Sequence, residues 1–343
     1  MAVLFADGFD WYTTADLFKR WTGAPGGGAA PQIVNTISRS PSGQALLSGG
    51  NSAESGTPYR SFGADYTQGV VGFAFYSTLT MSNRGALVAI LDGTSEQISV
   101  RTNGSSVPTI TRRGTVLATG STVLAVNTWY YLELKFTIHN AAGVVELRIN
   151  GASEIASTSS LNTRTTGTAR WNGVGVNSAN IAPFWYYDDL YVLDPTAGAN
   201  TDFLGPVQVV ARYPDGNGAH SDWTPNGGSN MGCVSEPYED GNASFNQSST
   251  ANQVDTFTMQ NVPAATGPVI AVAHHTVAAQ DGGAARTIRP KYRISGTDYN
   301  GASVNTGASY AFLTEVKDVS PATSSAWTIA EVNGMETGYE LVS

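Results

Sequence analysis

A predicted β-hairpin over residues 129–151 constrains the fold of this chain more than any other stretch. Its sequence, WYYLELKFTIHNAAGVVELRING, alternates apolar and polar side chains on both sides of a glycine-containing turn. That period of two is typical of a half-buried antiparallel pair. A register that pairs Phe136 with Val145 also places Glu133 opposite Arg148 on the face predicted to meet solvent. A slip by one residue would exchange the two faces, so the pattern specifies the register strongly.

Short strands recur along most of the chain, with Gly, Asn and Ser between them. Only 13% of the residues are charged, against about 25% in an average globular domain, and this suits strands joined by turns better than helical bundles. Regular spacing of short strands is typical of β-sandwiches and jelly rolls. The chain is therefore predicted to be all-β. The predicted strands span residues 2–10, 44–47, 69–76, 87–92, 97–102, 108–112, 115–119, 169–176 and 185–193, then 207–213, 256–259, 269–278, 285–294 and 309–315.

Length and charge predict two domains. A chain of 343 residues exceeds the usual size of a single domain. The segment PTAGAN at 195–200 is the best boundary, which gives domains at 1–196 and 201–343. The second of these is a smaller and more acidic β-sandwich, and it carries most of the net charge of −9. A negative balance of this kind disfavours binding to nucleic acid or to anionic membrane surfaces.

Two short helices are predicted. The first follows Thr14 as its N-cap, in the sequence DLFKRW. The second lies near the C-terminus, where Thr328 and Glu331 form a capping box and Gly338 is the candidate C′ residue. Helix is thus a minor part of the fold.

The chain has no recognisable targeting or membrane segment. Its opening, MAVLFADGFDWY, has no basic region followed by a long apolar core, and no stretch approaches the ~18 apolar residues of a membrane span. We expect neither a cleaved export signal nor membrane insertion. The one cysteine, Cys233, cannot form an internal disulfide, and we expect a buried, inert thiol.

Carboxylates are not spaced for glycoside hydrolysis. A retaining glycosidase needs two of them about 5–5.5 Å apart. Glu133 has Lys135 two residues later, where a second acid would be needed. Asp188 and Asp189 are adjacent in a strand, so they are expected to point to opposite faces.

The sequence also lacks the other catalytic and metal-binding patterns that we considered. His274 and His275 alternate between the two faces of a strand, and no His, Cys or carboxylate cluster nearby supplies further metal ligands. The sequence has no nucleophile elbow with Ser, His and Asp in order, and the glycine-rich PGGG is not a phosphate loop because no GK[ST] follows it. We therefore expect no enzyme activity, no cofactor and no bound metal.

One aromatic run has two interpretations. Trp185, Tyr186 and Tyr187 lie in a predicted strand, where aromatic side chains usually pack in the core. If they were exposed, their rings would stack on sugars, with the nearby Asn177 and Asn180 as amide partners. These five residues form the candidate glycan-binding site.

Residues 1–194 resemble the concanavalin A-like (laminin G-like) jelly-roll domain. The resemblance rests on the hairpin NTWYYLELKFTI…GVVELRINGA and on the strand WYYDDLYVLD. In that strand Asp188 and Asp189 take the places of the acidic pair common in the superfamily. The resemblance implies a jelly roll for the first domain. Lectin members bind calcium through grouped Asp and Asn ligands, and no such group is placed in this sequence.

A second resemblance covers nearly the whole chain. The segments FADGFDWY, DDLYVLD…DFLGPVQVV, DWTPNGGSN, DTFTM, GTDYNGA and PATSSAWTIAEVNGMETGYEL, in this order, resemble a family of tailed-bacteriophage virion structural proteins. The resemblance implies a tail or capsid-surface component, assembled in the host cytoplasm into a virion alongside other virion proteins. Since particles are built by repetition, a homotrimer or larger ring is expected.

Three functions follow as alternatives. The preferred one is a non-enzymatic virion structural protein, whose first domain presents a surface and whose acidic second domain docks or oligomerises. The second is a carbohydrate-binding module that attaches the particle to a host surface glycan. The third, a polysaccharide depolymerase, is the least expected because the paired carboxylates are missing from the sequence pattern.

Overall fold

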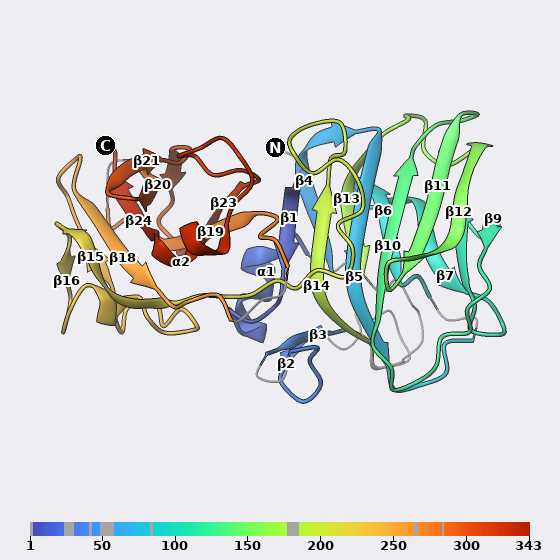
Figure 1. Cartoon of the computed structure of the whole chain (residues 1–343), viewed down its shortest axis with the longest axis horizontal. Helices are drawn as coiled ribbons and strands as arrows, with labels where there is room; N and C mark the ends of the chain where they lie inside the picture. The colour runs from blue at the N-terminus through green and yellow to red at the C-terminus, as the bar shows by residue number, and fades with distance from the viewer. Residues whose placement is uncertain are drawn as a thin grey trace. The chain divides into compact units, whose positions relative to one another are not determined.

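The chain is almost entirely β-structure, as predicted (Figure 1). A computed structural model describes residues 3–23, 31–40, 43–48, 58–82, 85–176, 185–263, 267–282 and 285–343. It divides into two compact units, Ala2–Val209 and Val210–Ser343. Among the described residues, no helix has the length and apolar character needed to cross a membrane.

The first unit is a sandwich of two antiparallel sheets. The larger has the order β12-β11-β10-β5-β14-β3-β2, with β1 also paired to β14, and the smaller has the order β4-β13-β6-β7-β8-β9. The strands are β1 (Val3–Asp7), β2 (Gln32–Val34), β3 (Ala45–Ser48), β4 (Tyr59–Tyr66), β5 (Gln68–Ser77), β6 (Val88–Asp92), β7 (Ser95–Thr102), β8 (Pro108–Arg112), β9 (Thr115–Thr119), β10 (Tyr130–Thr137), β11 (Gly143–Ile149), β12 (Ala152–Leu161), β13 (Trp171–Val176) and β14 (Trp185–Leu193).

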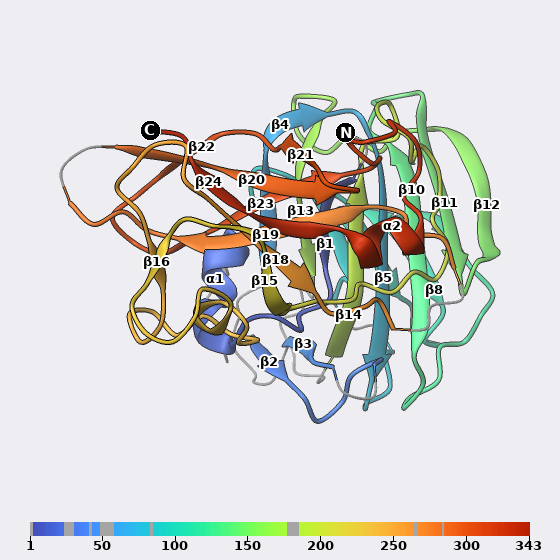
Figure 2. The same cartoon turned by 60° about the vertical axis from the view of Figure 1, so that its left-hand side comes forward.

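The hairpin register is confirmed. Phe136 pairs with Val145 and Glu133 pairs with Arg148 across β10 and β11, which lie side by side in both views (Figures 1 and 2). The inward-facing side chains of Phe136 and Val145 are buried. Two tryptophans of this unit differ in burial: Trp171 is buried, whereas Trp129 is half-buried.

The other face of the hairpin is not open to solvent at Glu133, which corrects the prediction. Glu133 is fully buried. Its Oε1 accepts hydrogen bonds from the Tyr191 hydroxyl at 2.5 Å and from the Gly205 N–H at 2.8 Å. The Arg148 guanidinium instead lies 4.1 Å from the centre of the Phe203 ring. The segment 201–209 therefore covers this face, a contact that local alternation does not encode.

The two units divide later than the predicted boundary. Residues 201–209 belong to the first unit, and the predicted strand at 207–213 is wrong because β15 begins only at Pro214. Isolated hydrogen bonds hold this segment in place of a sheet ladder. Arg39 Nη1 donates to the Val207 carbonyl at 2.5 Å, and the Val209 N–H donates to Asp189 Oδ1 at 2.7 Å. The linker-like sequence at 195–200 therefore does not mark the domain boundary, because the residues that follow it, 201–209, still belong to the first unit.

The second unit is a smaller β-structure. Its main sheet has the order β15-β18-β24-β20-β21, with β22 paired to β20, and two-stranded sheets are formed by β19 with β23 and by β16 with β17. The strands are β15 (Pro214–Ser221), β16 (Thr224–Pro225), β17 (Asn246–Gln247), β18 (Val254–Met259), β19 (Val272–Ala278), β20 (Arg286–Ile294), β21 (Thr297–Asn300), β22 (Val304–Thr306), β23 (Ala311–Lys317) and β24 (Glu336–Leu341). Its core contains Tyr292, Ile294, Trp327, Val332 and Met335.

Short helices occur near the predicted places. In the first unit, a 3₁₀ turn, η1 (Thr14–Asp16), leads into α1 (Leu17–Arg20), with Thr13 rather than Thr14 as the N-cap. The second unit has the 3₁₀ turn η2 (Met231–Cys233) and the C-terminal helix α2 (Ile329–Gly334).

The capping box of α2 is only half formed. Thr328 Oγ1 accepts the Glu331 N–H at 3.1 Å, as the capping-box pattern predicts. The Glu331 carboxylate instead accepts a bond from the Ser320 hydroxyl. Gly338 is not a C′ residue, because it lies in β24 and Met335 is the C-cap.

Candidate functional site

The three aromatic residues of the predicted glycan site belong to the core. Trp185 and Tyr187 are 0% exposed and Tyr186 is 8% exposed. Strand β14 lies between β5 and β3, and every one of its residues is buried, so both faces of the strand are covered. The rings are thus unavailable for stacking on a sugar, and the prediction is wrong for them. The other two members, Asn177 and Asn180, lie outside the described residues.

The prediction that Asp188 and Asp189 point to opposite faces is wrong, because both carboxylates contact Arg39. Asp188 Oδ2 accepts the Arg39 N–H at 2.9 Å, and Asp189 Oδ2 lies 2.6 Å from Arg39 Nη1. A register shift follows Asp188, and Asp189 has a φ of +49°, so the local alternation is broken. Burial, and then the neighbouring Asp189 charge, hold the pKa of Asp188 well above its usual range. These acids anchor the chain segments around them.

The segments that carry the virion-protein resemblance form similar buried frameworks. In FADGFDWY, Asp7 accepts hydrogen bonds from the Tyr12 hydroxyl at 2.9 Å and from Trp21 Nε1 at 3.1 Å. In DWTPNGGSN, the Trp223 N–H and the Asn230 amide both donate to Asp255, at 2.9 and 2.7 Å. Each segment ties a loop to a strand through a buried acid.

A polar cavity of about 700 Å³ opens on the six-stranded sheet of the first unit. That size falls within the range of ligand sites. It is lined by β7, β8, the β8–β9 turn and the loop that contains Thr165 and Thr166. The sequence-based prediction missed this cavity, because it depends on a loop that reaches the sheet from far along the chain.

Strand alternation explains why the cavity is polar. On β8, alternate residues enter the core or face the cavity, whereas on β7 the alternation holds around Val100 and Arg101 and is broken by Glu96 and Thr102 near its ends, which also line the cavity. The core residues Ile98, Val100 and Ile110 are fully buried. The cavity residues include Arg101, Thr109 and Thr111. The sequences SEQISVRT and TITR carried this signal, yet alternation alone does not say whether a polar face lines a cavity or an open surface.

A hydrogen-bonded cluster forms one wall of the cavity. Arg101 Nη2 lies 2.9 Å from Glu96 Oε2, and Arg101 Nε donates to Ser99 Oγ at 2.9 Å. The Ser99 hydroxyl also lies 3.0 Å from Thr111 Oγ1. Glu96 is the one carboxylate among the described residues of the lining, and its charge is compensated by Arg101. This wall is suited to binding rather than to general acid catalysis.

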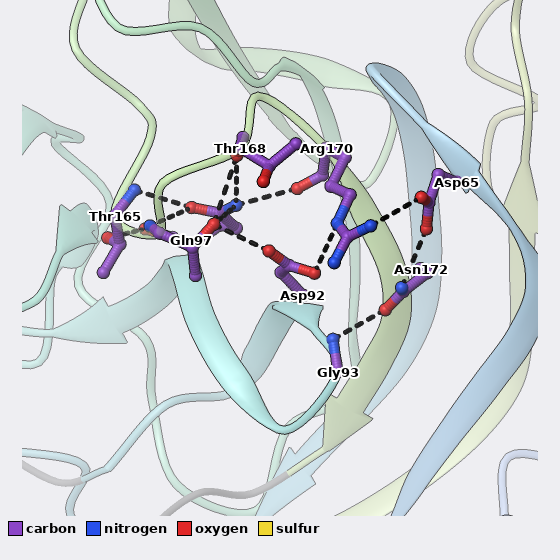
Figure 3. Close-up of polar contacts among 9 residues, drawn as sticks. Asp65, Asp92, Gly93, Gln97, Thr165, Thr168, Arg170 and Asn172 are labelled. Atoms are coloured by element: carbon purple, nitrogen blue, oxygen red, sulfur yellow. Dashed lines mark hydrogen bonds and ion pairs between the residues drawn. The ribbon is translucent and has the colours of Figure 1, made fainter.

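Gln97 holds the loop that contributes Thr165 and Thr166 to the cavity lining (Figure 3). It is fully buried. Its Nε2 donates to Thr166 Oγ1 and to the Arg170 carbonyl, both at 2.8 Å, and its Oε1 accepts the Thr165 N–H at 2.6 Å. The Thr165 hydroxyl donates in turn to the Gln97 carbonyl at 2.9 Å. The amide of Gln97 thereby fixes the positions of two cavity-lining threonines.

An ion-pair network continues from this loop to the neighbouring strands (Figure 3). Arg170 bridges Asp92 and Asp65, with N···O distances of 2.8 Å to each. Asn172 Nδ2 donates to Asp65 Oδ1 at 2.9 Å, and Asn172 Oδ1 accepts the Gly93 N–H at 2.7 Å. The hydrogen bond from Asn172, together with those from Arg170, lowers the pKa of the Asp65 carboxyl. The network supports the loop but lies outside the cavity lining.

The described residues hold no candidate metal centre. Within them, no group of three or more His, Cys, Asp and Glu side chains is placed to bind a metal ion. His274 is buried with its ring 5.7 Å from that of Tyr292, and His275 Nδ1 lies 2.8 Å from Thr314 Oγ1. Cys233 is buried, as predicted, and its thiol lies 3.0 Å from the Gly227 carbonyl oxygen.

Comparison with known proteins gives only distant structural likenesses. No protein-family model and no curated protein matches the sequence. A sialidase from Trypanosoma rangeli, in complex with a difluoro-KDN, has 11% identity and a TM-score of 0.34; the match covers 48% of this chain and 27% of that chain. This chain thus spans about a quarter of the sialidase.

Two smaller proteins match over more of their length. The cellulose-induced protein Cip1 has 14% identity and a TM-score of 0.41, over 55% of this chain and 96% of that chain. Domain 4 of the extracellular arabinanase AbnA from Geobacillus stearothermophilus, in complex with arabinotriose, has 15% identity and a TM-score of 0.34. The match covers 49% of this chain and 76% of that chain. At these values the likeness concerns the β-sandwich fold alone and does not show enzyme activity.

Proposed function

We propose that this chain is a non-enzymatic structural protein of a bacteriophage particle, in the tail or on the capsid surface. One observation supports the proposal above the others. The sequence segments that resemble virion structural proteins coincide with buried frameworks, such as those around Asp7, Asp189 and Asp255, that tie loops and the 201–209 segment to the sheets. A family defined by such segments shares an architecture rather than a reaction centre.

The proposal includes the surroundings of the protein. It is assembled in the host cytoplasm into the virion, where it contacts other virion proteins as a homotrimer or larger ring. The first unit presents a surface, and the acidic second unit docks or oligomerises. No nucleic-acid or membrane contact forms part of this role, in line with the net charge of −9.

Immunogold labelling of purified particles tests the proposal. An antibody against residues 201–343 is applied to intact particles and to particles opened with mild denaturant, and the particle proteins are identified by mass spectrometry in parallel. Label on the tail or the capsid, with the chain among the particle proteins, is the expected result. Absence of the chain from particles by both methods overturns the proposal.

A second candidate function, carbohydrate binding for host attachment, is favoured by a different observation. The cavity on the six-stranded sheet is lined mainly by hydroxyl, amide and guanidinium groups, which are suited to a polyhydroxylated ligand. Glycan-array binding by the intact protein is the expected result. Release of reducing ends from host polysaccharide would instead establish the third alternative, a depolymerase.

A further inference from the structure

We propose that the cavity on the six-stranded sheet binds an acidic saccharide, with Arg113 and Arg101 holding its carboxylate. The inference rests on the carbohydrate-binding function proposed above and names its ligand class. Arg101 projects from β7 and Arg113 lies in the β8–β9 turn, and both line the same cavity. Guanidinium groups recognise carboxylates through paired, charge-assisted hydrogen bonds.

The cavity offers more hydrogen-bond donors than acceptors. Asn103 Oδ1 accepts the N–H groups of Ser105 and Val107, at 2.9 and 3.1 Å. These bonds orient the amide and leave its NH₂ group without a partner among the described residues. Arg113 is exposed, and its guanidinium has no hydrogen bond or ion pair within the described part of the chain, so a ligand would have to displace only water from it. A ligand rich in acceptor oxygens matches this imbalance.

The hydroxyl groups of Thr165 and Thr166 are already engaged. Thr166 Oγ1 donates to Asp92 Oδ2 at 2.7 Å, and Thr165 Oγ1 donates to the Gln97 carbonyl. Each of these oxygens retains acceptor capacity but has spent its proton within the protein. The donors that remain for a ligand are therefore concentrated on Arg113, Arg101 and Asn103.

The backbone at Arg113 is a second, independent observation. Arg112 pairs with Thr115, and the two residues between them, Arg113 and Gly114, have φ values of +45° and +82°. A two-residue hairpin with both φ values positive strongly favours Asn, Asp or Gly at the first position, because a left-handed conformation is unfavourable for other residues. An arginine there is kept against local preference, and strain of this kind is often found at binding sites.

The charge distribution makes anion binding a local property. The chain has a net charge of −9 and a sequence pI near 4.9, so it repels anions in general. The described lining contains two arginines against one carboxylate, Glu96, which is already paired with Arg101. No aromatic ring is among the described lining residues, so a neutral sugar lacks a stacking platform. The anionic group of the ligand must therefore supply much of the affinity.

Calorimetric titration of the full chain tests the inference. The probes are tetragalacturonate and α2,8-linked trisialic acid, which carry carboxylates from two classes of acidic sugar, with maltotetraose as the neutral counterpart and inorganic polyphosphate as a polyanion without sugar. We expect one of the acidic saccharides to bind about tenfold more tightly than maltotetraose and polyphosphate. Which of the two binds identifies the class of acidic sugar.

Variants at neighbouring arginines separate the site from general electrostatics. Arg113→Asn should weaken binding of the acidic saccharide about tenfold, and Arg113→Lys should weaken it by less, since the charge remains but the paired donors are lost. Arg112→Asn removes the same charge one residue away, outside the cavity lining, and should leave the affinity within about twofold of the wild type.

Each other outcome overturns the inference. These outcomes are equal losses in the Arg112 and Arg113 variants, equal binding of maltotetraose or polyphosphate, or no binding of either acidic saccharide. Binding of maltotetraose or of glycans on an array, unaffected by Arg113→Asn, would keep the carbohydrate-binding function and reject this cavity. Immunogold labelling reads out the virion role separately from all of these results.

Discussion

Removing the amide of Gln97 should destabilise the first unit and release the loop that lines the cavity. Gln97→Leu keeps roughly the same volume but deletes the three short bonds to Thr166, Arg170 and Thr165. A buried polar group left without a partner costs about 1–3 kcal/mol. Thr165 and Thr166 are only partly buried, so water satisfies some of the lost bonds. We therefore expect a loss of about 3 kcal/mol in the free energy of unfolding.

Two measurements check this prediction. Urea denaturation gives the stability of the unit, and hydrogen exchange of the Thr165 amide reports on the loop itself. Gln68→Ala is the matched control, because Gln68 is exposed on β5 and its substitution should change stability by less than about 0.5 kcal/mol. If Gln97→Leu matches Gln68→Ala in stability, and the Thr165 amide exchanges as in the wild type, the reasoning is refuted.

Three further predictions concern pH, strain and close packing. Burial lowers the pKa of His274 to about 4, so between about pH 6.5 and 4 the unfolded chain binds a proton that the folded chain does not. The free energy of unfolding of the second unit should therefore fall by about 3 kcal/mol as the pH is lowered across this window. Urea titrations should show a flatter dependence of stability on pH for His274→Phe. Arg113→Asn should raise the stability of the first unit by about 1 kcal/mol in the same assay, because Asn tolerates a positive φ, and a lower stability would contradict the turn assignment. A Cβ on Gly8 would lie 2.6 Å from the Val209 carbonyl oxygen, whereas one on Gly63 meets nothing within 4 Å. Gly8→Ala should therefore speed hydrogen exchange at the Val209 amide and lower the free energy of unfolding by about 1–3 kcal/mol. An effect no larger than that of Gly63→Ala would refute this prediction.

Local sequence patterns predicted local structure well. Strands β8, β9 and β14 have the expected limits, and the hairpin has the expected register. Alternation and turn residues determine these features within a few residues of chain. Trp185–Leu193 also carries a further signal. A nearly continuous apolar run indicates a strand buried on both faces, which favours core packing of Trp185, Tyr186 and Tyr187 over stacking on a sugar.

Features that depend on distant segments were not predictable in this way. Glu133 is buried only because residues 201–209 lie over the hairpin, and the two acids after Tyr187 converge on Arg39 only because of a local irregularity in β14. The cavity requires the loop at 165–166 to meet β7, a pairing separated by some 70 positions. The periodicity of a single sequence depends on residues that are close together in the chain and does not report such contacts. The cavity and its arginines could therefore be identified only from the structure.

Buried polar groups elsewhere in the chain have a structural use that Arg113 does not share. With few charged residues, the protein uses its buried acids and amides as acceptors for the loops: Asp7, Gln97 and Asp255 each accept two or more hydrogen bonds. Hydrogen-bonded networks of this kind rigidify a fold. Arg113 differs from these buried groups, because it is exposed, makes no hydrogen bond or ion pair within the described chain, and lies on a backbone that disfavours arginine. The ligand-binding role that we propose for Arg113 would explain why an arginine is kept on this backbone.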